Sequence, residues 1–599
     1  MSTGTGRVLA LKGVLFFGIL MLIGMIALAG VLPVSRAHGA ASVAEPRVTS
    51  ITQITRDGFR KTNLLADDSQ LFITELPGAN RVIARVSLPD SSRPSSDRSS
   101  SGRSVVPSPF SNLQALDLSP DHSKLLVAPI QTGSSDDEFW TLPVAKGSPE
   151  RIGDLTGRDA AWSSDGQHLV FSKGAVIYLA GANGTAAHEL YTASGSVFAP
   201  RFSPDGNIIR FTVSDVAQST TQLWEIGQDG SNPHALLTKW EHASTACCGS
   251  WTADGRYYVF QASQTVPHTL TLFTALWALP SSAAGGDISG LVQLTNGPMS
   301  FGNASVAHDS KRMWSIGVQP FGEVVKYERA SKKFVPVLPG VSATDLAFSP
   351  DGKWVTYVSV PEATLWRSRA NGSDRLQLTT APGRVALPVW SPDGKQIAFV
   401  SMQPGESWKL FLVPAGGGNP RPVLTENGSQ IDANWSADGT RLMFGDFRND
   451  VGGLSIRVLD FKTQKIETIP GSQGMFSPRW SPDGRYIAAL SPDNTTLKLF
   501  DFQTQKWTNW LVESAGAVSY PIWSPDSQYI FFDDLVSGEE SIRSVKVGES
   551  QPELTCVLGP VDRFPGGLGT WIGRAADGSW MLVRDRSTQE VYQLSLELP

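Results

Sequence analysis

The sequence predicts an all-β chain built from about twelve copies of a four-stranded repeat. Three observations carry this prediction: one turn motif recurs along the chain, its copies are evenly spaced, and the composition favours short strands. The chain has 599 residues, with 57 Gly, 39 Pro and 18 Trp. Many turn formers together with many aromatic residues are typical of short strands joined by tight turns.

The recurring motif is an aromatic or apolar residue, then Ser-Pro-Asp-Gly, then two polar residues and an alternating apolar run. The clearest copies contain Asp205, Asp351, Asp393 and Asp483. In such a turn, proline presets φ at the first corner, aspartate accepts hydrogen bonds from backbone amides, and glycine takes the positive φ. Looser copies are centred on Asp67, Asp121, Asp165, Asp254, Asp309, Asp438, Asp526 and Asp577.

The spacing of the motif predicts β-propellers. Successive motif aspartates, such as Asp351 and Asp393, are separated by the length of one four-stranded propeller blade. Each motif turn joins the first two strands, and a second hairpin follows, as around Asn371-Gly372. Twelve blades predict tandem β-propellers in two six-bladed rings, a first propeller over 41–330 and a second over 331–599, although a seven-plus-five division also fits.

The two ends of this region are expected to pair. Residues 591–596 form a third strand of the last repeat with no room for a fourth, and residues 50–55 resemble a free fourth strand. Pairing them closes a ring and hides its open edge. We therefore expect deletion of residues 41–56 to destabilise the C-terminal blades.

The N-terminal segment predicts attachment to a membrane. Val14 to Leu32 is an uncharged apolar run of about the length that a transmembrane helix needs. Arg7 and Lys12 precede it, so residues 1–13 form a short cytoplasmic tail and the propellers lie in the periplasm or outside the cell. The alternative is a signal peptide cleaved near residues 37–40, which yields a secreted protein.

The Ser-Pro-Asp-Gly repeats, over about residues 50–599, closely resemble the Pro-Asp variant of WD-type repeats. That variant occurs in TolB-like periplasmic proteins and in the propellers of prolyl oligopeptidase-type enzymes. The layout also resembles bacterial membrane-anchored regulators in which a winged-helix domain precedes the membrane helix. Only the short segment 1–13 precedes the helix here, so the winged-helix domain of that family is expected to be missing.

The sequence favours a binding or scaffolding role over catalysis. The net charge of −6 argues against nucleic acid as a partner. No G-x-S-x-G, H-E-x-x-H, P-loop or C-x-x-C pattern occurs, and all eight histidines lie at or before residue 308, so we expect no catalytic residue, no metal site and no cofactor. Two alternatives stay open: a metal-dependent hydrolase whose ligands are scattered over a propeller channel, and a sensory ectodomain that signals through a separate partner.

Candidate binding residues lie on the loop face, opposite the motif turns, where variable loops carry function on a rigid scaffold. We expect a protein or peptide partner to dock there. The first group could also be a metal or redox site, although a structural loop with two inert cysteines is favoured. The others could also bind a cation, although solvated loops are favoured. The candidates are Trp240, Glu241, His242, Cys247 and Cys248, then Asp446, Arg448 and Asp450, and finally Asp533 and Asp534.

Overall fold

The computed structural model describes residues 45–599 except 79, 89–101, 131–135, 216–219, 244, 266–271, 284, 298, 381–382, 404–405, 427, 449–452, 492–493, 513–517, 535–539, 560 and 567–568. The described residues contain no helix. They form twelve four-stranded antiparallel sheets and one two-stranded hairpin. The predicted all-β fold with four strands per repeat is therefore confirmed.

Six sheets form the first propeller, and each is one blade. Its blades are, in order, β2 (Arg60–Ala66), β3 (Gln70–Leu76), β4 (Val82–Ser87) and β5 (Arg103–Val105); β6 (Leu113–Leu118), β7 (Lys124–Pro129), β8 (Asp137–Pro143) and β9 (Glu150–Gly157); β10 (Asp159–Trp162), β11 (His168–Lys173), β12 (Val176–Gly181) and β13 (His188–Thr192); β14 (Ser196–Phe202), β15 (Ile208–Asp215), β16 (Thr220–Gly227) and β17 (His234–Ala235); β18 (Cys247–Trp251), β19 (Tyr257–Thr265), β20 (Leu272–Pro280) and β21 (Val292–Gln293); and β22 (Ser300–Val306), β23 (Arg312–Gln319), β50 (Thr588–Glu597) and β1 (Arg47–Gln53). The innermost strands contact one another in the cycle β2, β6, β10, β14, β18, β22 and back to β2, which closes the ring.

The other six four-stranded sheets form the second propeller. Its blades are β26 (Ala343–Phe348), β27 (Trp354–Ser359), β28 (Leu365–Arg369) and β29 (Leu376–Gln377); β30 (Arg384–Trp390), β31 (Gln396–Met402), β32 (Lys409–Pro414) and β33 (Arg421–Pro422); β34 (Ser429–Trp435), β35 (Arg441–Arg448), β36 (Gly453–Asp460) and β37 (Ile466–Thr468); β38 (Phe476–Trp480), β39 (Tyr486–Leu490), β40 (Thr496–Asp501) and β41 (Lys506–Val512); β42 (Val518–Trp523), β43 (Tyr529–Asp534), β44 (Ser541–Lys546) and β45 (Glu553–Val557); and β48 (Ile572–Arg574), β49 (Trp580–Asp585), β24 (Gly322–Glu328) and β25 (Lys333–Pro336). The hairpin β46 (Pro565–Gly566) and β47 (Gly569–Thr570) precedes the last blade. The six-plus-six division is therefore the one that forms.

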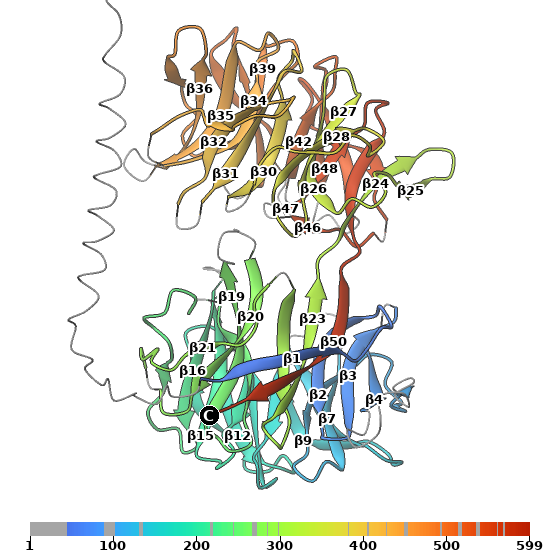
Figure 1. Ribbon diagram of the computed structural model, residues 1–599, viewed down its shortest axis with the longest axis vertical. Coiled ribbons are helices and arrows are strands. Elements are labelled where there is room, and N and C mark those ends of the chain that lie inside the picture. The colour runs from blue at the N-terminus through green and yellow to red at the C-terminus, as the bar shows by residue number, and fades with distance from the viewer. Residues whose placement is uncertain are drawn as a thin grey trace, which may run out of the picture. The chain divides into compact units, whose positions relative to one another are not determined.

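The second propeller is inserted into the last blade of the first. The chain leaves the first ring after β23, passes through all of the second ring from β24 to β49, and returns as β50. There β50 pairs with β23 on one side and with β1 on the other. Figure 1 shows this blade, with the N-terminal β1 in blue beside the C-terminal β50 in red.

The predicted pairing of the two ends is confirmed, but the ring that it closes was predicted wrongly. Ile51 lies opposite Leu594, as expected. However, β50 belongs to the first propeller, because its other edge pairs with β23 over Arg312 to Gln319. The second propeller therefore covers residues 322–585 and not 331–599, and it closes through β24 pairing with β49.

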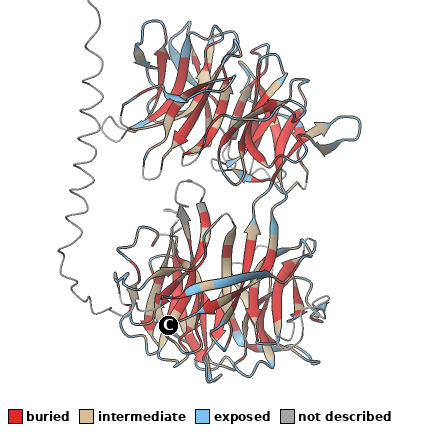
Figure 2. Ribbon diagram, viewed as in Figure 1, coloured by how far each residue is buried: buried red, intermediate tan, exposed pale blue. Residues whose placement is uncertain are grey.

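Apolar clusters between neighbouring blades hold the rings together, and Figure 2 shows buried residues in red along the strands. In the first ring, Leu71 of blade one packs with Trp314 and Val591 of blade six. In the second ring, Val324 of blade six packs with Val355 of blade one. Burial of such side chains between blades is the main force that favours a closed ring.

The motif turns adopt the predicted geometry. In the copy at Asp351, the Ser349 hydroxyl donates to Asp351 Oδ1 at 2.6 Å, and the Lys353 amide donates to the same oxygen at 3.1 Å. Gly352 has a φ of 66°, which only glycine adopts without cost. The preceding aromatic packs between blades as expected, since Trp390 Nε1 donates to Ala347 O of the neighbouring blade at 3.0 Å.

The predicted tail 1–13 and membrane segment Val14–Leu32 lie outside the described residues. Within residues 45–599, with the gaps named above, no helix is long and apolar enough to cross a membrane.

Candidate functional site

The inner strands of the second propeller carry a repeated irregularity that faces its channel. In five consecutive blades the register between the first two strands shifts at a β-bulge. The residue at each bulge has a left-handed backbone: φ is 47° at Asp345, 49° at Leu387, 56° at Asp432, 52° at Ser477 and 46° at Tyr520. Such a φ is uncommon for residues other than glycine, and bulges of this kind redirect side chains. The strain is typical of functional positions.

Each of these bulge residues lies six positions before the motif aspartate of its blade, as Asp345 does before Asp351. The first propeller uses the same position in three blades, where Ala199, Cys248 and Asn303 have φ values of 50°, 57° and 52°. In these blades the repeat therefore places one side chain at the wall of a channel, and the residue type at that position differs from blade to blade.

In the second propeller, Arg479 joins three blades across the channel wall. Its Nη1 donates to Asp432 Oδ1 of the preceding blade at 2.7 Å, and its Nε donates to Pro521 O of the following blade at 3.1 Å. The Ser477 hydroxyl also donates to Asp432 Oδ2, at 2.6 Å. Both charges are largely removed from water, with side-chain exposures of 16% for Arg479 and 13% for Asp432. This arginine therefore acts as a structural tie.

The first propeller repeats this tie in the same two blades. Arg201 of blade four lies beside Asp159 of blade three and also beside Asp117 of blade two. Burial raises the pKa of both carboxyl groups, while Arg201 acts in the opposite direction. Burial also opposes the charge of Arg201, but the two carboxylates outweigh it and raise the pKa of the guanidinium. One arginine thus lies beside two carboxylates in this channel.

A cavity of about 290 Å³ lies in the channel of the second propeller, lined by all six blades. Its polar residues outside the Arg479 tie are Asn434 and Arg574, which form hydrogen bonds to the backbone, and Asp345 and Tyr520. The Asp345 carboxylate and the Tyr520 hydroxyl face each other, but neither Asp345 Oδ1 nor Tyr520 Oη completes a hydrogen bond of good geometry with a described residue. Burial raises the pKa of Asp345 to about 6, with the Asp432 charge adding to this effect. Burial and the Asp345 carboxylate also raise the pKa of the Tyr520 phenol above its ordinary value.

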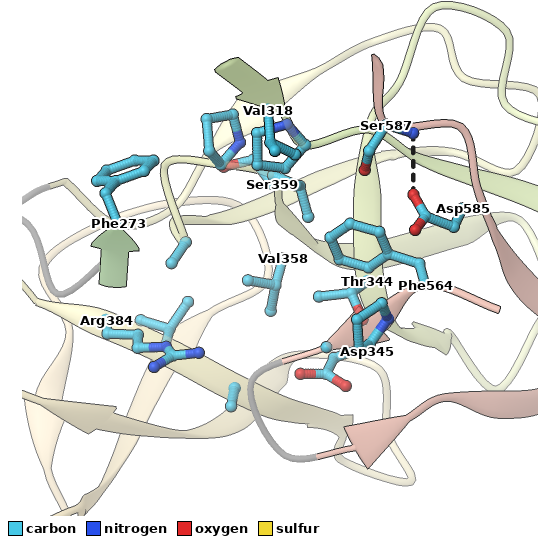
Figure 3. Close-up of a pocket in the computed structure, with 18 of the residues that line it drawn as sticks. Phe273, Val318, Thr344, Asp345, Val358, Ser359, Arg384, Phe564, Asp585 and Ser587 are labelled. Atoms are coloured by element: carbon cyan, nitrogen blue, oxygen red, sulfur yellow. Dashed lines mark hydrogen bonds between the residues drawn. The ribbon is translucent and has the colours of Figure 1, made fainter. Parts of the chain in front are cut away.

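The same carboxylate faces a second opening at the start of the inner strands. Figure 3 shows Asp345 there with Thr344, Phe564 and Val358, and with Arg384 across the opening. Burial lowers the pKa of Arg384, and the Asp345 charge acts in the opposite direction. In the part of the chain that the structure describes, Arg384 forms no hydrogen bond and no close ion pair.

The structure places the residues that the sequence predicted in three separate blades. Trp240 packs edge-on against Trp277 at a centroid distance of 4.7 Å and belongs to an apolar cluster. The His242 ring lies at 5.2 Å from the Trp240 ring, and its Nε2 is 3.3 Å from Oε1 of the exposed Glu241. This group is a packed loop, with Glu241 alone turned to solvent.

The two adjacent cysteines are free thiols at the start of β18. Cys248 occupies the bulge position of its blade, so it lies beside the Arg201 group of the first channel. A hydrogen bond with Cys247 and burial raise the pKa of the Cys248 thiol well above its ordinary value. A neutral thiol is a poor nucleophile and a poor metal ligand, which argues for a structural role.

Asp446 and Asp533 are buried ion-pair partners and not the exposed loop residues that we predicted. Asp446 accepts a hydrogen bond from Arg457 Nη1 at 3.0 Å. Asp533 accepts two from Arg563, at 2.6 and 3.0 Å, and burial raises its pKa. Both lie near the end of the second strand of a blade, where the strand periodicity turns them inward.

The remaining predicted residues add little to a site. Asp534 is also buried, with Oδ2 at 3.5 Å from Arg543 Nε. Arg448 is the last residue of β35. Asp450 lies outside the described residues.

Sequence reasoning missed the channel residues of the second propeller, namely Thr344, Asp345, Arg384, Asp432, Arg479 and Tyr520. A signal existed: a charged residue or a tyrosine six positions before the motif aspartate is unexpected on a buried inner strand. Among residues 45–599, outside the gaps named above, no cluster of three or more His, Cys, Asp or Glu could hold a metal ion.

Comparison with known proteins identifies no function. No protein-family model matches the chain. A curated relative, the uncharacterized peptidase YuxL of Bacillus subtilis strain 168, is 27% identical over 121 residues, which are 19% of this chain and 18% of that protein. The chain thus spans less than a fifth of this relative's length.

The similar solved structures are β-propeller proteins. A putative TolB from Agrobacterium tumefaciens is 18% identical, with a TM-score of 0.36 over 44% of this chain and 98% of its own. The tricorn protease is 12% identical, with a TM-score of 0.31 over 83% of this chain and 49% of its own. TolB proteins are thus among the solved structures that this chain resembles, as its repeats predicted.

Proposed function

We propose that this protein is a non-enzymatic binding or scaffolding protein that docks a protein or peptide partner on the loop face of its second propeller. The observation that carries this proposal is a set of exposed apolar side chains on three adjacent blades. Phe447, Val512 and Val557 are 42%, 60% and 37% exposed. Large apolar side chains that face water on one side of a rigid scaffold favour a protein interface.

Strand pairing puts these three residues on the same face. Phe447 lies opposite Ser429, Val512 opposite Thr496, and Val557 opposite Ser541. Each pair is at the end of its blade that is remote from the motif turn. This is the face on which we expected a partner, although the residues differ from those that the sequence suggested.

The environment of the channels supports a binding role over catalysis. In the second channel Arg479 holds Asp432 in an ion pair, and in the first channel Arg201 lies beside Asp159 and Asp117. A charge that is committed to structure in this way does not serve as a general acid or base, and Asp345 is the carboxylate of the second channel that the Arg479 tie does not use. A rigid scaffold with an exposed apolar rim is what a docking protein needs.

We also propose that the propellers lie outside the cytoplasm and are held at the membrane by Val14–Leu32. This proposal is based on the sequence alone, on the uncharged run and the preceding Arg7 and Lys12. Carbonate extraction of membranes tests the anchor: an integral protein stays in the pellet, whereas a cleaved, secreted form is released.

Site-specific photo-cross-linking in native membranes tests the docking face. A photoreactive phenylalanine analogue replaces Val512 or Val557, and a matched control replaces Lys395, an exposed residue on the motif-turn face. We expect a discrete adduct from the first two positions and none from the control. Equal adducts from both faces, or no adduct from Val512 and Val557, would refute the docking proposal.

A further inference from the structure

Four polar side chains of the second channel lack well-formed hydrogen bonds, and they line two openings that share Asp345. Thr344 Oγ1, Asp345 Oδ1 and Tyr520 Oη are buried without a hydrogen bond of good geometry to a described residue. Thr344 is 5% exposed and Asp345 is 2% exposed. Arg384, with no close ion pair among the described residues, is the fourth. A buried polar group without a partner is unfavourable, so a ligand that forms hydrogen bonds with several of these groups is stabilised by them.

The first propeller shows that this arrangement is not inherent in the repeat. At the bulge of its fifth blade, Cys248 takes the place that Tyr520 has in the second propeller. Its channel arginine, Arg201, is flanked by two carboxylates and carries no unmatched charge. The unpaired groups are therefore a property of the second channel, where side-chain identities depart from the structural pattern.

Asp345 and Arg384 have opposite charges but do not form an ion pair with each other among the described contacts. Figure 3 shows them on opposite sides of the opening, with Val358, Thr344 and Phe564 around it. A ligand that bridges them must present a cation to Asp345 and an anion to Arg384. Guanidinium groups suit carboxylates because they can donate two parallel hydrogen bonds.

The space limits the size of that ligand. The opening that Asp345 and Arg384 both line has a volume of about 320 Å³, at the lower end of the range for small-molecule pockets. Its walls include the apolar side chains of Val358, Val385 and Phe564. A small zwitterion with an apolar side chain matches the charges, the volume and the walls.

We propose that the second channel binds a free α-amino acid with an apolar side chain, its carboxylate on Arg384 and its ammonium group on Asp345. The Thr344 hydroxyl group supplies a further hydrogen bond, and the side chain of the amino acid lies against Phe564 in the same opening. This site opens at the same end of the blades as the docking face but uses other residues, and it does not depend on a protein partner.

The electrostatic surroundings predict how binding responds to pH. The charged and titratable groups that face Asp345 are Arg384, Asp432 and Tyr520. Because burial raises the Asp345 pKa to about 6, the carboxylate that holds the ammonium group is lost below that pH. Affinity is therefore expected to fall by about tenfold per pH unit below 6.

Calorimetric titration of the full chain with each of the twenty L-α-amino acids tests the proposal without any mutation. We expect apolar amino acids to bind, and their N-acetyl and methyl ester derivatives to bind at least about tenfold more weakly, because each derivative removes one charge. Absence of binding by all twenty, or equal binding of the derivatives, would overturn the proposal.

Variants then assign the two charges. Asp345→Asn and Arg384→Gln are each expected to weaken binding at least about tenfold. Arg485→Gln is the matched control, since Arg485 is an exposed arginine of the same propeller that pairs with Asp501 at 3.2 Å. Unchanged affinity in both channel variants, with native thermal stability, contradicts the assignment. If Val512 cross-links to a partner protein but no amino acid binds, the amino-acid proposal is refuted and the docking proposal is not.

Discussion

Closure of the first propeller depends on one buried carboxylate, Glu590 of β50. Its Oε1 accepts a hydrogen bond from the Gly58 amide at 2.9 Å, and its Oε2 lies 3.2 Å from Lys61 Nζ. The Thr55 hydroxyl also donates to Oε2. The Lys61 side chain is fully buried and that of Glu590 is 7% exposed. Residues near the two ends of the chain are thus joined by a charge cluster away from water.

Glu590→Ala is expected to lower the free energy of unfolding by about 3 kcal/mol. Removing one partner of a buried ion pair typically costs about 3–5 kcal/mol, because the other charge stays buried. The lower end applies here because Lys61 keeps Asp57 at 2.5 Å and the carbonyl oxygens of Phe59 and Gln589, both at 3.0 Å. Against a typical total of about 5–15 kcal/mol, the loss is large.

Urea unfolding followed by tryptophan fluorescence measures this change, since Trp314 is fully buried in the same blade. Glu597→Ala is the control. It removes an ion pair with Arg47 that joins β50 to β1, but those side chains are 58% and 70% exposed, and such pairs contribute about 0–1 kcal/mol. If both variants lose the same stability, burial of the charge cluster is not what closes the ring.

Three further predictions concern the channel and the inserted ring. The Asp345 pKa of about 6 lies above its unfolded value of about 3.9, so its contribution to stability is full below pH 4 and falls by about 3 kcal/mol as the pH rises through 6. Urea titrations at pH 4.5 and 7 measure this loss, and Asp345→Asn should remove it. An unchanged pH dependence in the variant contradicts the assignment to Asp345. Arg479→Met leaves Asp432 buried without its charge partner and should cost about 3–5 kcal/mol in the same assay, whereas a loss below about 1 kcal/mol means that the tie is not structural. Deletion of residues 46–55 should increase hydrogen exchange first in β50 and β23, and faster exchange first in the second propeller would contradict the nested topology.

The blades could be predicted from the sequence because the turn that starts each one is local. Ser349, Asp351 and Gly352 lie within four residues, and their hydrogen bonds and positive φ follow from residue type alone. Even weak copies at Asp67, Asp309 and Asp577 lie between the first two strands of a blade. Twelve such turns therefore define twelve sheets without any knowledge of distant contacts.

Which strands complete each ring could not be predicted in the same way. The open edges that β50 fills belong to β1 and to β23, the second strand of the sixth blade of the first propeller. The residues of the motif turns do not indicate which of the two rings β50 completes. The decision rests on pairing between residues that are far apart in the chain, such as Ile316 with Val591. Local sequence patterns do not predict such contacts.

The candidate site was missed for a related reason. Polar residues on predicted loops, such as Asp446 and Asp533, looked available, but distant arginines pair with them in the folded chain. Asp345 and Tyr520 lie on inner strands that are expected to be core, and only the bulge turns them toward the channel. Exposure and partnership are properties of the assembled ring, and the repeat motif does not encode them.

The nested connection sets an order of assembly during synthesis. A ribosome delivers the chain from its N-terminus, so the strands of the second propeller, residues 322–585, are all present before β50 emerges. The inner propeller can close while the outer one still lacks the strand between β23 and β1. The first propeller is therefore synthesised first but completed last. Its open strand edges at Met313 and Ile51 stay exposed to other chains until residues 588–597 are synthesised.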